Sequence, residues 1–190
     1  MAETGDESQN PDKAKRRAWA LDMWGECVSL CGTPGEDYFV RKRKIDVGPL
    51  NVNHCLRWHN GQKTIVGLMR SPLNGTPVGI QRIYPKDGTK KMLGTKGVVC
   101  LTPFTEVTHG LGICEGVVDG LVLLAIEQAP IWCAMDCGSI SSFPLVPGIE
   151  SLTIFADNDA PGIKAARSCN RRWADADLEV RIIYPTGGPA

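Results

Sequence analysis

The sequence has no apolar run long enough to cross a membrane. Nowhere among its 190 residues do about eighteen apolar residues follow one another, so we expect no transmembrane helix. Residues 1–17 are polar and charged and lack the apolar stretch of a secretory signal. These absences predict a cytoplasmic protein with no membrane partner.

The chain also has no excess of charge of either sign. Its 21 lysines and arginines balance 21 aspartates and glutamates, so the formal net charge is zero. Polyanion binding by the whole surface is therefore not expected. A nucleic-acid site has to arise from local clustering of basic residues.

Cysteine pairs with the spacing of zinc ligands are missing. None of the eight cysteines forms a CxxC pair, and none of the three histidines pairs with a cysteine at ligand spacing. Cys27 and Cys31, like Cys133 and Cys137, are four residues apart among apolar neighbours, which is typical of small buried side chains. We expect free thiols in a reducing compartment and no structural zinc.

The chain divides by composition into three parts. Residues 1–12 are polar, with acidic and small side chains and a proline, and are predicted to be a disordered tail. Residues 13–105 read as an α+β N-terminal lobe, and residues 106–190 as an α/β domain. No linker-like stretch separates the last two, so we expect one unit of two lobes.

The N-terminal lobe begins with helical patterns and continues with short strands. Apolar residues at helical spacing predict a helix over 13–31, with Trp19 and Trp24 in the core. A second helix is expected from about Pro34. A small antiparallel sheet follows, with turns marked by Asn-Gly and Asp-Gly; its strands are expected at 64–69, 77–84, 90–94 and 98–101.

In the C-terminal half, short apolar runs alternate with helical patterns. This alternation predicts a mostly parallel sheet flanked by helices. The expected strands are 111–114, 131–134, 152–156 and 180–184, and the expected helices are 117–128 and 163–173.

Three carboxylates follow two of these strands directly. Glu115 comes after the run at 111–114, and Asp157 and Asp159 come after the run at 152–156. The carboxyl ends of parallel strands share one edge of a sheet, so the three side chains can converge there. Clustered carboxylates repel one another without a cation, and their oxygens suit Mg²⁺ or Mn²⁺. By themselves, the same residues are also ordinary turn and helix-capping residues.

Together, EGVVDGLVLL (115–124) and FADNDAPGIKAA (155–166) resemble the two signature blocks of the Toprim domain, which bacterial-type primases, topoisomerases, recombination proteins and some nucleases share. The resemblance implies that Glu115 is a general acid/base and that Asp157 and Asp159 bind Mg²⁺. Asp119 matches an accessory acidic position of the primase branch.

An upstream resemblance extends to primase-like Toprim proteins of phages, plasmids and other mobile elements. GTPGEDYFVRKRKI (32–45) and VGIQRIYPKDGTKKMLG (78–94) are similar to segments that precede Toprim in those proteins. It implies that Arg82, Lys90 and Lys91 contact nucleic acid or nucleotides. Neither the zinc-binding domain of full primases nor a helicase P-loop occurs in this sequence.

These resemblances predict a Mg²⁺-dependent, primase-like nucleotidyltransferase that acts on single-stranded DNA and nucleotides, with a separate helicase as a candidate partner. Two alternatives stay open. The first is a metal-dependent nuclease that uses the same carboxylates. The second is a catalytically silent Toprim protein of a mobile element that acts by binding or inhibition.

Overall fold

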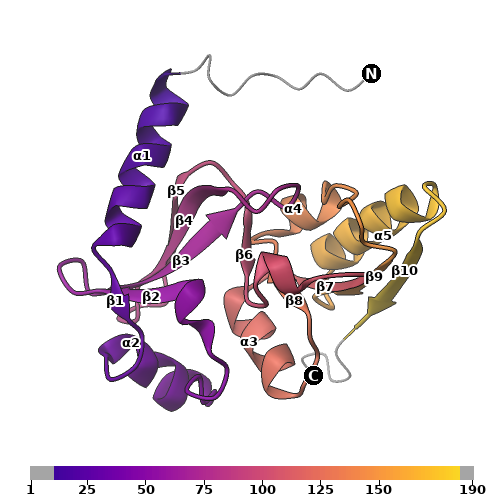
Figure 1. The fold of residues 1–190 in the computed structure, drawn as a ribbon. Coiled ribbons are helices and arrows are strands. Elements are labelled where there is room, and N and C mark those ends of the chain that lie inside the picture. The colour runs from indigo at the N-terminus through magenta and orange to yellow at the C-terminus, as the bar shows by residue number, and fades with distance from the viewer. Residues whose placement is uncertain (1–10, 185–190) are drawn as a thin grey trace.

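The computed structural model describes residues 11–184. One mixed sheet of ten strands runs through both lobes of this part of the chain (Figure 1). Its order is β1-β2-β3-β6-β8-β7-β9-β10, with β4 and β5 attached to β3. The strands are β1 (Val28–Ser29), β2 (Leu56–His59), β3 (Thr64–Arg70), β4 (Pro77–Ile83), β5 (Lys90–Gly94), β6 (Val98–Cys100), β7 (Gly110–Cys114), β8 (Ile131–Cys133), β9 (Ser151–Phe155) and β10 (Glu179–Ile183).

Helices cover both faces of this sheet. The α-helices are α1 (Pro11–Gly25), α2 (Pro34–Asp37), α3 (Val117–Ala125), α4 (Cys137–Ser141) and α5 (Ala160–Ala174). A π-helical segment, Tyr38–Arg43, continues α2, and short 3-10 turns occupy Val52–His54 and Phe104–Glu106.

The N-terminal lobe is antiparallel, as the turn residues predict. β3 and β4 are joined through Asn74 and Gly75, and β4 and β5 through Asp87 and Gly88. Both glycines have positive φ, which a residue without a side chain adopts without strain. The four strands expected in this lobe are therefore confirmed.

The prediction of one helix over 13–31 is wrong at both ends. α1 begins earlier, at Pro11, where the fixed φ of proline suits the first turn of a helix. It ends at Gly25, and Val28 and Ser29 then pair with Trp58 and Arg57 of β2. That pairing joins residues about thirty positions apart, so helical periodicity within one window does not reveal it.

In the C-terminal half, β8, β7, β9 and β10 form the predicted parallel sheet. α3 packs on one face with the N-terminal lobe, while α4 and α5 pack on the other. Successive side chains of β8 point to opposite faces of the sheet. Ile131 and Cys133 therefore pack in the core on the α3 side, and Trp132 packs in the core on the α5 side. The mostly parallel α/β architecture is thus confirmed.

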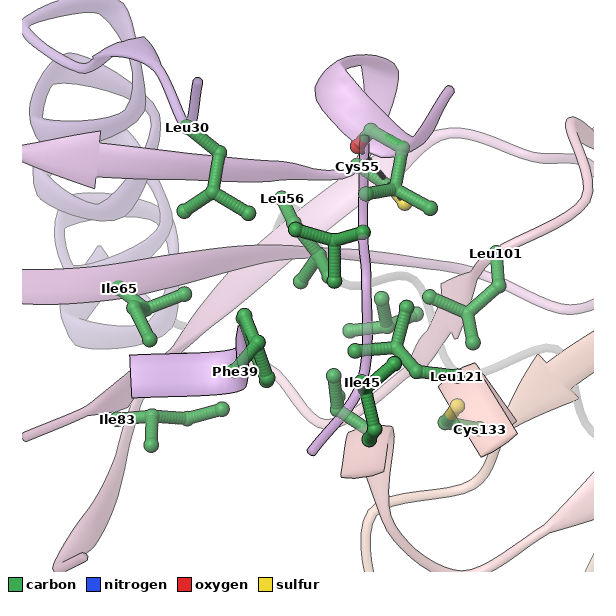
Figure 2. Packing of buried hydrophobic residues seen from close by; sticks show 14 of the residues in the cluster. Leu30, Phe39, Ile45, Cys55, Leu56, Ile65, Ile83, Leu101, Leu121 and Cys133 are labelled. Atoms are coloured by element: carbon green, nitrogen blue, oxygen red, sulfur yellow. Dashed lines mark hydrogen bonds between the residues drawn. The ribbon is translucent and has the colours of Figure 1, made fainter. Parts of the chain in front are cut away.

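One hydrophobic core joins the two lobes. Figure 2 shows Phe39, Ile45 and Leu56 of the N-terminal lobe facing Leu121 of α3 and Cys133 of β8. All five side chains are buried. Because this core is shared, Lys90 of the first lobe is held close to the carboxylates of the second.

Several smaller expectations are corrected. Trp24 packs on the sheet, but Trp19 is 53% exposed because the first half of α1 extends past the strands. Cys31 is exposed rather than buried. Residues 137–141, for which the sequence predicts no helix, form the short helix α4, and Asp136 caps it.

The predicted disordered tail falls largely outside the described residues, of which only residues 11 and 12 belong to it, and these are helical. The boundaries proposed for the two lobes stay predictions. Within residues 11–184, no helix combines the length and the apolar character that crossing a bilayer requires.

Candidate functional site at the carboxyl edge of the parallel sheet

Glu115 and Asp157 lie just beyond the carboxyl ends of two neighbouring parallel strands, β7 and β9. β7 pairs with β9 so that Cys114 lies opposite Phe155, the last residue of each strand. Glu115 follows directly, and Asp157 follows after one buried alanine. The structure therefore brings together the strand ends that carry the two predicted blocks.

This edge is where the direction of chain winding changes. From β7 the chain crosses to β8 on one side through α3, whereas from β9 it crosses to β10 on the other side through α5. Because these helices lie on opposite faces, a crevice opens between the ends of β7 and β9. Such switch points are the usual ligand sites of open α/β sheets.

The carboxylates lie close enough for their charges to influence one another. The pKa of Glu115 is raised, first by burial and then by the charges of Asp157, Asp136 and Asp159. Burial first, and then Asp119 and Asp159, likewise raise the pKa of Asp157. In both cases the Lys90 ammonium acts in the opposite direction.

Asp159 has a structural role besides its place in the cluster. It is the N-cap of α5, and its Oδ1 accepts a hydrogen bond of 2.7 Å from the Gly162 backbone N–H. Gly162 is needed for space, since an added Cβ would lie 2.6 Å from the carbonyl oxygen of Asp157. The capping role that the sequence left open is therefore present at Asp159.

Asp119 and Lys90 flank the start of α3. A Cβ added at Gly116 would lie 2.5 Å from Oδ2 of Asp119 and 3.8 Å from Nζ of Lys90. Asp119 also contributes to the raised pKa of Asp157. Both predicted residues thus point toward the carboxylate edge.

Arg82 and Lys91 lie on the other face of the sheet. Lys91 is opposite Arg82 across β4 and β5, whereas Lys90 is opposite Ile83. Neighbouring residues of a strand point to opposite faces, so Lys90 alone of the three basic candidates faces the carboxylates. A pattern of basic residues in sequence does not separate the two faces.

Asp136 is a site residue that sequence reasoning missed. It follows β8 and caps α4, and its Oδ1 accepts from the backbone N–H of Ser139, while Lys96 Nζ lies 2.6 Å from its Oδ2. Burial alone would raise the pKa of Asp136, but the bonds from Lys96 and Ser139 hold it below its ordinary value. The available signal was the same as for Glu115, a carboxylate soon after an apolar run.

The donor set fits a hard divalent cation. Carboxylate oxygens are the ligands that Mg²⁺ and Mn²⁺ prefer, and a cation would relieve the repulsion that raises the pKa values of Glu115 and Asp157. Among residues 11–184, no three Asp, Glu, His or Cys side chains already stand close enough together to hold an ion. Mg²⁺ in proteins is commonly held by one or two carboxylates together with waters and substrate phosphates.

A cavity of about 590 Å³ opens beside the carboxylates. Asp119 and Asp157 stand in its wall, which is otherwise mainly apolar and includes Leu123, Phe155 and Tyr184. A volume of this size accommodates a small organic ligand. The carboxylates therefore border a cavity whose wall is mainly apolar but carries the two acidic side chains Asp119 and Asp157.

Comparison with known proteins identifies the C-terminal half. Residues 110–189 match the family model of the Toprim domain. No curated protein matches the sequence.

Solved primase structures share the fold at low identity. The zinc-binding and RNA polymerase domains of the Aquifex aeolicus primase are 16% identical, with a TM-score of 0.60 over 96% of this chain and 58% of that one. A DnaG primase catalytic domain bound to single-stranded DNA is 13% identical, with a TM-score of 0.59 over 94% of this chain and 74% of that one.

The primase fragment of the bacteriophage T7 primase-helicase is 18% identical, with a TM-score of 0.50 over 67% of this chain and 55% of that one. This chain thus spans little more than half the length of the phage and Aquifex structures. The likeness shows that this chain shares the fold of these primase structures, and the family model locates a Toprim domain at residues 110–189.

Proposed function

We propose that this Toprim domain protein is a divalent-metal-dependent, primase-like nucleotidyltransferase that acts on single-stranded DNA and nucleotides in the cytoplasm. The observation that supports this most strongly is the joining of Glu115 and Asp157, with Lys90 beside them, at the switch point of a sheet with a primase-type fold.

In the proposed reaction, the 3′-hydroxyl of a growing strand attacks the α-phosphorus of a nucleoside triphosphate. A P–O bond to the strand forms, the bond to the β-phosphate oxygen breaks, and pyrophosphate leaves. Glu115, Asp157 and Asp159 would hold Mg²⁺ or Mn²⁺, which when bound neutralises charge on the phosphates.

The remaining roles belong to side chains of this chain. Lys90 is placed to bind a phosphate oxygen, because it already counters the charges of Glu115 and Asp157. Glu115 is half-buried at the end of β7 and is the candidate to accept the proton of the hydroxyl. Asp119 borders the cavity and would limit where the nucleotide lies.

The test is incorporation of labelled ribo- and deoxynucleotides on single-stranded DNA with Mg²⁺ or Mn²⁺. Wild type should make short products, and Asp157→Asn should make none. Asp175→Asn is the matched control, since Asp175 is exposed at the far end of α5. Equal products from wild type and Asp157→Asn would refute the assignment.

The same reactions distinguish the two alternatives. Cut DNA with no incorporation, lost in Asp157→Asn, would identify a nuclease. Intact DNA with no product would favour a silent binding protein. A separate helicase partner would then be sought by co-purification.

A further inference from the structure

The first half of α1 extends beyond the sheet that anchors the second half. Ala20 is fully buried and, with Leu21 and Trp24, packs against Val66 and Leu68. Residues 11–19 are exposed, apart from a half-buried Arg17. Figure 1 shows this end of α1 standing clear of the strands.

This extended half is strongly basic in a chain of zero net charge. It carries Lys13, Lys15, Arg16 and Arg17 against the single acid Asp12, which gives four positive charges minus one negative, a net of +3. Positive charges near a helix N-terminus oppose the helix dipole, so this placement does not serve helix stability. An anion bound there would interact favourably with both the side chains and the dipole.

An exposed aromatic ring stands among these charges. Trp19 is 53% exposed, and Lys15 Nζ lies 5.0 Å from the centre of its ring. A large ring left in solvent beside cations is the combination that binds single-stranded nucleic acid, in which bases stack and phosphates pair with cations. The other exposed side chains are small or charged, so this half lacks the apolar face that a membrane-surface helix needs.

The sheet face under α1 is basic as well. Arg57, Arg82 and Lys91 lie in one row across β2, β4 and β5, with Val66 between the first two. Arg57 stacks on Trp24 of α1 at 4.4 Å from the ring centre. The positive charge of α1 therefore continues onto this side of the lobe, away from the carboxylates.

We propose that the first half of α1 is a binding site for single-stranded nucleic acid, separate from the carboxylate edge, with Lys15, Arg16 and Arg17 on phosphates and Trp19 stacked on a base. The proposal extends the proposed function by naming a second contact with the strand. It holds the strand whether or not the carboxylate edge is catalytic.

The test is fluorescence anisotropy of a labelled oligothymidylate in EDTA, over a range of salt concentrations. Replacing Lys15, Arg16 and Arg17 together with alanine, a strong helix former, should lower affinity about 100-fold at 0.1 M salt. The slope of log K against log salt should fall by about 2. Trp19→Ala should weaken binding about 5- to 150-fold and leave that slope unchanged.

The matched control removes the same charge from another helix of equal length. Lys164, Arg167 and Arg171 are exposed on α5, and their replacement with alanine should leave the affinity unchanged. Circular dichroism and thermal unfolding establish that each variant is folded. If the two triple variants lose affinity equally, or the α1 variant binds like wild type, the proposal is overturned. Binding of anionic vesicles in place of the oligonucleotide would overturn it too.

This outcome is independent of the proposed enzyme activity. EDTA removes divalent cations, so the binding measured here does not depend on a metal at the carboxylate edge. Binding lost with α1 in a protein that incorporates no nucleotides would uphold this inference and reject the enzyme. Nucleotide incorporation by wild type, together with unchanged DNA binding by the α1 variant, would support the enzyme and reject this inference.

Discussion

Replacing Asp159 separates its capping role from its charge. The side chain accepts the Gly162 N–H bond at the start of α5, and its charge helps to raise the pKa values of Glu115 and Asp157. Alanine at this position removes both the bond and the charge. Asparagine keeps a capping oxygen and removes only the charge, since it caps helices about as well as aspartate.

The expected magnitudes follow from these two contacts. Loss of an N-cap costs about 1 kcal/mol of unfolding free energy. In a chain of this size that lowers the melting temperature by about 2–4 °C. Asp159→Asn removes a repelling charge near neutral pH, so it should melt at or above wild type. Asp159→Ala should melt about 2–4 °C below Asp159→Asn, because both lack the charge and only one keeps the cap.

Calorimetry at neutral pH in EDTA measures this difference. Equal melting temperatures for the two variants would show that the cap contributes nothing. An asparagine variant that melts well below wild type would refute the inferred repulsion. Added Mg²⁺ should then raise the melting temperature of wild type more than that of either variant, since binding to the folded state alone stabilises it.

Three further predictions concern the same edge of the sheet. Gly162→Ala should lower the free energy of unfolding by about 1–3 kcal/mol, because the added Cβ would clash with the Asp157 carbonyl oxygen. Urea unfolding measures this, and a more stable variant would contradict the prediction. The fold raises the pKa of Asp157, so the ionised side chain destabilises the folded state at pH values above that pKa. Asp157→Asn should therefore be more stable than wild type at neutral pH. That advantage should fade toward about pH 4 in melting curves, and a constant advantage would refute it. Lys96→Met should raise the pKa of Asp136, as carbon NMR titration can measure; an unchanged value would remove Lys96 as the cause.

Local signals in the sequence were enough for much of this fold. The Asn-Gly and Asp-Gly pairs set the two hairpins of the first lobe, because they permit positive φ at the turn. Apolar runs that end in carboxylates located Glu115 and Asp157 at strand ends. The two Toprim blocks placed those strands in a known order, which the family match over 110–189 supports.

Other features depend on contacts between distant segments. β1 and β2 were missed because β1 forms only by pairing with β2, and β2 lies between β1 and β3. Strands of two or four residues carry too little periodicity to be recognised from sequence. Trp19 was expected in the core because its helix is apolar at regular intervals. Only the length of the sheet beneath α1 decides that packing stops at Ala20.

The sequence by itself determined most of the elements, their order and the chemical nature of the carboxylate edge, since turn chemistry, hydrophobic period and strand-end residues act over a few neighbouring positions. Tertiary structure alone decided that Asp136 joins that edge and that Lys90 faces it while Arg82 and Lys91 face away. The physical reason is the pleat and the register of the strands. Adjacent residues point to opposite faces, and which face meets the carboxylates depends on how strands far apart in sequence are paired.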